Sequence, residues 1–156
     1  MYRRVFAISS FALILCLPAL SADKPDFSGV WKMNNDKSDF GPIPKPDKYE
    51  SKINHKDPEL KVSTTQSGEQ GEMTVDVVFS TDGNETSNKI GPGEMKSKGR
   101  WEGKILVIDS KLDFQGNEIG ISEKWNLSED GKTIVIDRVI NSPQGDLAIK
   151  ATLEKQ

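Results

Sequence analysis

Glu123 and Arg138 are the residues of this 156-residue chain whose types and spacing best suit chemistry. Both fall in the stretch 117–141, where alternating apolar residues predict two strands joined by a polar turn. If Leu127 lies opposite Ile134, Glu123 faces Arg138 on the side that the apolar residues mark as interior. Arg138 could then bind a ligand carboxylate or phosphate through two hydrogen bonds. The alternative is a hydrated pair at the mouth of a barrel, which binds nothing.

A second set of residues on the same predicted face is small or uncharged. It consists of Thr86, Asn88, Ser97 and Gly99, with Ser51 and Thr64 beside them. These residues could line a solvated cavity for a small polar or amphipathic molecule, or the strands could splay and leave the face in water. The tryptophans are predicted mainly as core, and Trp101, Trp125 and Ile136 would form an apolar wall. The candidate ligand-binding residues are therefore Arg138, Glu123, Trp101, Trp125, Asn88 and Ser97.

Other kinds of chemistry find little support in the residues. His55 is the only histidine and is predicted to be exposed beside Asp57, and Cys16 is the only cysteine, so no zinc set is present. No nucleophile elbow, glycine-rich phosphate loop or calcium-loop spacing occurs. We therefore expect no catalysis, no metal and no cofactor.

Residues 1–22 have the features of a cleavable signal peptide. Arg3 and Arg4 precede an apolar run at 5–17, which is too short to span a bilayer, and small residues end at Ala22. Removal would leave one domain, residues 23–156, with a net charge of −5, because two of the 21 basic residues and none of the 24 acidic ones lie in 1–22. We expect a secreted or periplasmic protein without disulfides. Its acidity argues against nucleic acid or an anionic membrane as partner.

The remainder of the chain predicts strands and no helix. Alternation marks strands at 27–33, 49–55, 60–64, 73–79, 86–90, 95–101, 106–114, 117–127, 134–140 and 147–153. Residues 34–47 carry three prolines and predict an extended loop, either functional or connecting. The opposite face is charged, the reverse of a membrane barrel. The predicted fold is all-β: an antiparallel meander of about eight to ten strands that forms a lipocalin-like β-barrel or a strongly curled sheet.

Turn positions predict the strand registers. Asp82-Gly83 is a two-residue hairpin signal that would place Phe79 opposite Thr86. The other hairpins would pair interior residues with interior residues. A slip of one residue would turn every side chain of a strand to the opposite face, so this agreement supports the predicted registers. The predicted pairs are Ile90 with Met95, Gly99 with Leu106, Ile108 with Trp125, Trp125 with Ile136, Ile136 with Ala151, Ser110 with Glu123 and Ile149 with Arg138.

The segment Phe27-Ser28-Gly29-Val30-Trp31-Lys32, followed by an antiparallel meander, resembles the calycins. Within them it is similar to the opening of the fatty-acid-binding proteins, and the chain also resembles small secreted bacterial lipocalin-like domains of unknown function. The resemblance implies a tryptophan that closes one end of a barrel, and a cavity for fatty acids or other small apolar ligands. The two-helix lid of that family is replaced here by residues 34–47. Its carboxylate-binding Arg-x-Tyr corresponds to Lys150-Ala151-Thr152.

These observations predict an exported, soluble β-barrel that binds a small lipid-like, apolar or amphipathic ligand without catalysis. The mature chain would have no membrane span. The alternative is a structural or protein-interaction module of the cell envelope, with a packed interior and no ligand.

Overall fold

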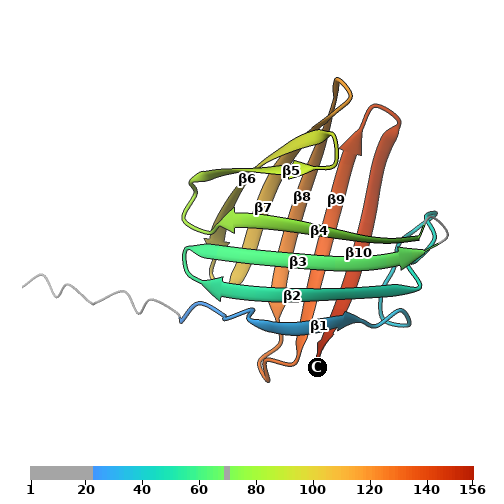
Figure 1. Ribbon diagram of the computed structural model, residues 1–156. Coiled ribbons are helices and arrows are strands. Elements are labelled where there is room, and N and C mark those ends of the chain that lie inside the picture. The colour runs from blue at the N-terminus through green and yellow to red at the C-terminus, as the bar shows by residue number, and fades with distance from the viewer. Residues whose placement is uncertain (1–22, 69–70) are drawn as a thin grey trace, which may run out of the picture.

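The computed structural model describes residues 23–68 and 71–156 of the chain (Figure 1). The signal peptide predicted for residues 1–22, with Cys16, lies outside the described residues. Within the described part, no helix is long and apolar enough to cross a lipid bilayer. The regular elements of this part are strands, as the period-two alternation of the sequence predicts.

Ten strands follow one another in an antiparallel meander, which confirms the predicted fold class. The hydrogen-bonded order is β4-β3-β2-β1-β10-β9-β8-β7-β6-β5, so the first strand pairs with the last. The strands are β1 (Gly29–Met33), β2 (Lys48–Lys56), β3 (Glu59–Gly68), β4 (Gly71–Ser80), β5 (Glu85–Ile90), β6 (Gly93–Glu102), β7 (Ile105–Phe114), β8 (Asn117–Leu127), β9 (Thr133–Ser142) and β10 (Gly145–Lys155).

The sheet curls into a nearly closed, flattened barrel, because neighbouring twisted strands rotate relative to one another. In Figure 1 the strands β1–β4 pass in front of β7–β10 and cross them steeply. Pairing of β1 with β10 joins the two halves. The core between them is built from inward side chains of both halves: Phe27, Trp31, Ile53, Leu60, Val62, Phe79, Met95, Leu106, Ile108, Trp125, Ile134, Ile136, Ala151 and Leu153. All of these lie on the face that the alternation predicts to be interior.

The two ends of the sheet, β4 and β5, do not form the hairpin that Asp82-Gly83 predicts. Asp82 instead accepts hydrogen bonds through its carboxylate from the Asn84 amide (3.1 Å) and the Ser80 hydroxyl (2.6 Å). A side chain that satisfies its own turn in this way lets the following strand diverge. The predicted pairing of Phe79 with Thr86 is therefore wrong, and a seam lies between β4 and β5.

Two contacts hold this seam together. The side-chain amide of Asn88 accepts a hydrogen bond from the backbone N–H of Val78 (2.8 Å) and donates one to the Val78 carbonyl (2.9 Å). Farther along, the Ser80 carbonyl packs against Gly99 of β6 so closely that a Cβ there would lie 2.5 Å from the oxygen. One asparagine side chain thus replaces part of the missing backbone ladder, and a glycine allows the close approach.

The register between β7 and β8 differs from the prediction by two residues: Ile108 lies opposite Glu123. The cause of the shift is the turn, in which only Gln115 and Gly116 separate the two strands. Both residues have positive φ (53° and 79°), as a two-residue hairpin of this kind requires. Similar shifts place Asn88 opposite Met95 and Gly99 opposite Ile108. An even slip keeps every side chain on its face. The predicted β8–β9 and β9–β10 registers are confirmed.

Residues 34–47 form the predicted helix-free loop, and its first part packs along β10. The Asn34 amide donates to the Thr152 carbonyl, and Asp39 and Lys150 exchange two backbone hydrogen bonds. The Ser38 hydroxyl accepts from the Thr152 amide at 2.9 Å. The first part of the loop therefore continues the backbone pairing along β10 beyond the end of β1.

Candidate functional site

The interior of the barrel holds a cavity of about 250 Å³ between the two halves of the sheet. Most of its wall is apolar: Val62, Val75, Val77, Phe79, Ile90, Met95, Leu112, Ile121, Trp125 and Ile136. Polar groups complete it: Tyr49, Ser51, Thr64, Gln66, Ser110, Glu123 and Arg138. An apolar pocket with a few convergent polar groups is the usual form of a small-molecule site.

Glu123 and Arg138 form an ion pair on the wall of this cavity. They lie directly opposite each other on β8 and β9, as the sequence predicts. Nε of Arg138 donates to Oε1 of Glu123 at 2.5 Å, and Nη2 donates to the same oxygen. The indole N–H of Trp125 donates to the other oxygen, Oε2, at 3.2 Å. Both carboxylate oxygens are therefore held by N–H donors.

The two side chains of the pair differ in exposure. The Glu123 side chain is only 7% exposed, whereas the Arg138 side chain is 32% exposed and therefore partly reaches solvent. The neighbouring strands place apolar residues on either side, with Ile108 opposite Glu123 and Ile149 opposite Arg138. Ser110 is the residue predicted to lie opposite Glu123, but Ile108 takes that place. Ser110 lies opposite Ile121, because the β7–β8 turn is shorter than predicted.

The electrostatics of the site follow from this geometry. The Glu123 carboxylate is the main reason that the pKa of Arg138 is raised above its ordinary value, and the Tyr49 hydroxyl acts in the same direction. Burial opposes both effects, since it disfavours the charged form. The guanidinium therefore stays charged inside the barrel and is compensated by one carboxylate.

Three of the six predicted binding residues line the cavity: Arg138, Glu123 and Trp125. Asn88 instead bonds to the backbone of Val78 at the seam. Ser97 is 1% exposed and exchanges a 2.8 Å hydrogen bond with Ser110, so its hydroxyl is already satisfied. These strands are paired and do not splay.

Trp101, the remaining predicted residue, lies at one end of the barrel. Its ring stacks on Phe27 (centroids 6.0 Å apart, 5° between planes), and its indole N–H donates to Oδ1 of Asp57 at 3.1 Å. Trp125 meets the same Phe27 ring edge-on at 5.7 Å. The segment that precedes β1 thus closes this end of the barrel with an aromatic cluster.

His55 belongs to this cluster, and the prediction that it is exposed is wrong. The residue is 8% exposed and its ring centroid lies 5.7 Å from that of Phe27. Nδ1 accepts the Phe27 N–H at 3.4 Å, while Nε2 is buried without a hydrogen-bond partner in the described residues. Burial lowers the pKa of His55, although Asp26 and Asp57 oppose the shift. The alternation of β2 places His55 inside, and Phe27 of the N-terminal segment and Trp101 of β6 cover its ring.

Polar cavity residues that the prediction omitted come from the other half of the barrel. Tyr49 on β2 and Gln66 on β3 both line the cavity. The inward alternation of β2 already included Tyr49, but no pattern in the sequence says that β2 faces β9 across the interior. Ser51 and Thr64, which the alternation marks as inward, share a 2.8 Å hydrogen bond in the cavity wall.

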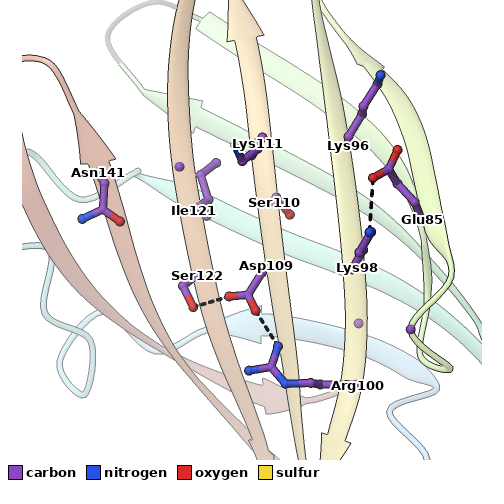
Figure 2. Close-up of a pocket in the computed structure, with 13 residues that line it drawn as sticks. Glu85, Lys96, Lys98, Arg100, Asp109, Ser110, Lys111, Ile121, Ser122 and Asn141 are labelled. Carbon is purple, nitrogen blue, oxygen red and sulfur yellow. Dashed lines mark hydrogen bonds and ion pairs between the residues drawn. The ribbon is translucent and has the colours of Figure 1, made fainter.

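A larger hollow of about 600 Å³ lies on the outer side of β6–β8 (Figure 2). Several of its charged groups pair with each other: Arg100 donates to Asp109 at 2.5 Å, and Ser122 donates to the same carboxylate at 2.7 Å. Lys98 and Glu85 lie 3.7 Å apart. The ionic side chains in these pairs are about half exposed or more, so the contacts are screened by water and contribute little. The interior cavity is the stronger candidate site.

The described residues contain no group of three or more His, Cys, Asp or Glu side chains that could hold a metal ion. In sequence comparisons, no protein-family model and no curated protein matches the chain.

Comparison with solved structures gives clear matches to small barrels. Zebrafish ileal bile acid-binding protein, complexed with cholic acid, is 20% identical, with 83% of this chain and 98% of that chain covered and a TM-score of 0.56. Human cRBP IV is 16% identical, with 85% and 99% covered and a TM-score of 0.60. A secretory abundant heat soluble protein from Ramazzottius varieornatus is 14% identical, with 83% and 94% covered and a TM-score of 0.58. The chain therefore has the same fold as these small β-barrels.

Proposed function

We propose that this protein is exported and binds a small apolar or amphipathic molecule in the interior of its barrel, without catalysing a reaction. The observation that carries the proposal is the cavity of about 250 Å³, with its apolar wall and the single Glu123–Arg138 pair. A core that served only stability would be filled to the density of an organic crystal, because empty volume forfeits packing energy.

The structural likeness supports this reading at the level of the fold. The zebrafish neighbour holds cholic acid, an amphipathic small molecule. Fold alone does not establish function, so the weight of the proposal rests on the cavity. The alternative of an envelope module with a packed interior is disfavoured by the same cavity.

Binding is tested with the purified full-length chain by native mass spectrometry and by thermal shift against a panel of lipids and metabolites. The proposal expects a co-purifying small molecule or a ligand that raises the melting temperature. Val75→Trp, which fills the cavity from β4, should abolish the effect. Val139→Trp is the matched control, because Val139 is 41% exposed on β9. Neither a bound molecule nor any thermal shift would count heavily against a ligand-binding role.

Export is tested separately by producing the full chain in a bacterium and measuring the intact mass of the product in each compartment. The features of residues 1–22 lead us to expect a secreted or periplasmic protein that begins at Asp23. An unprocessed chain confined to the cytoplasm would refute this part of the proposal alone.

A further inference from the structure

Building on the proposed ligand site, we propose that the cavity selects uncharged amphiphiles with a hydroxyl or amide head group and rejects the corresponding carboxylates. Glu123 is the residue that sets this selectivity, because it already neutralises the only cation in the cavity wall.

The argument begins with the charges that face the cavity. Among its lining residues only Glu123 and Arg138 carry a charge, and Tyr49 is the one further titratable group. The two charges cancel. Binding of a ligand carboxylate would therefore change the net charge of the site from zero to −1. An uncompensated negative charge of low solvent exposure is unfavourable.

The geometry of the pair adds a second obstacle. Nε and Nη2 of Arg138, one of the two edges of the guanidinium that can bind a carboxylate with two parallel hydrogen bonds, are both turned to Glu123. A ligand carboxylate could take this edge only by displacing Glu123. The displaced Glu123 would be left buried between β7 and β9 with one remaining donor, the Trp125 indole.

What the wall still offers suits a neutral polar group. The Arg138 side chain is 32% exposed, and the hydroxyl of Tyr49 and the side-chain amide of Gln66 lie in the same wall. Hydroxyls and side-chain amides both donate and accept hydrogen bonds, so they can satisfy an alcohol or a primary amide. The apolar remainder of the cavity would take the chain of such a molecule.

The size of the cavity limits the length of that chain. At ~30 Å³ for each water-sized group, a cavity of about 250 Å³ accommodates about eight such groups. Octanol, octanamide and octanoate are therefore suitable probes, because each has eight carbon atoms and they differ in the head group.

The experiment follows the indole N–H signal of Trp125 in ¹H–¹⁵N spectra of the full-length protein while each probe is added at about pH 8. At this pH octanoate is ionised. In the native protein we expect octanol and octanamide to bind at least about tenfold more tightly than octanoate, equivalent to about 1.4 kcal/mol. The Glu123→Gln variant frees Arg138 and keeps the shape of the side chain. In this variant the affinity for octanoate should rise at least about tenfold relative to the affinity for octanol.

Two further variants complete the test. Glu118→Gln is the matched control, because Glu118 lies on the same strand, is 66% exposed and pairs with Lys111 outside the barrel. It should leave the selectivity unchanged. Gln66→Lys adds a cation to the cavity wall and keeps the ion pair, so it should also favour octanoate, and it covers the case in which Glu123→Gln does not fold.

Each outcome decides something. Native protein that binds octanoate as tightly as octanol overturns the inference and leaves interior binding intact. Selectivity unchanged in Glu123→Gln, or in Gln66→Lys if the former does not fold, also overturns it. No shift of the Trp125 signal with any probe overturns both this inference and interior binding of ligands of this class.

Discussion

The Asn88 side chain bridges the seam between β4 and β5, and replacing it by alanine tests how much it contributes to closing the barrel. The Asn88 amide makes two hydrogen bonds to the backbone of Val78, of 2.8 and 2.9 Å. A hydrogen bond of this kind contributes about 0.5–1.5 kcal/mol net, so the loss of both should destabilise the protein by about 1–3 kcal/mol. For a domain of this size that corresponds to a fall in melting temperature of roughly 4–10 °C.

Two measurements on Asn88→Ala separate a seam effect from a general one. Urea denaturation gives the change in the free energy of unfolding, and hydrogen exchange gives the protection of the Val78 amide, which should fall more than that of amides in the β8–β9 ladder. Ser87→Ala is the control: its hydroxyl makes one exposed bond to Glu94, so the expected change is within about 0.5 kcal/mol. Asn88→Ala with native stability and undiminished Val78 protection would refute the reasoning.

Three further predictions concern the same barrel. Gly99→Ala should cost roughly 1–3 kcal/mol in urea denaturation, because its Cβ would lie 2.5 Å from the Ser80 carbonyl oxygen, whereas Gly120→Ala, with its nearest contact at 3.7 Å, should be almost neutral. Burial lowers the pKa of His55, so the unfolded chain takes up a proton near pH 6.5 that the folded protein refuses, and stability should fall below that pH by up to about 1.4 kcal/mol per pH unit. Trp125→Phe should cost roughly 1.5–3 kcal/mol, because it removes a hydrogen bond to a buried carboxylate.

These predictions have distinct points of failure. Equal costs for Gly99→Ala and Gly120→Ala would show that the close approach at the seam is not limiting. His55→Gln should flatten the pH dependence of stability below about pH 6.5, the ordinary pKa of histidine, and an unchanged slope would assign the dependence to other groups. A loss below about 0.5 kcal/mol in Trp125→Phe would mean that the indole does little to hold the carboxylate.

Much of the candidate site was predictable because a strand repeats every two residues. This period places Glu123, Arg138 and Trp125 on the inner face, and the turn between β8 and β9 sets the pair opposite each other. Errors of two residues in the β5–β6, β6–β7 and β7–β8 registers left every face unchanged. The sequence therefore predicted which residues face inward more reliably than which residues are neighbours.

The sequence by itself thus determined the all-β class, the antiparallel meander, the inner face and the charged pair, because each depends on local alternation and turn chemistry. Only the tertiary structure decided how the two halves meet. It left a cavity between β2–β4 and β5–β9, closed the seam with Asn88 and buried His55 beneath Phe27. These features depend on contacts between residues far apart in the chain, whose geometry follows from the twist and closure of the whole sheet and leaves no periodic trace in the sequence.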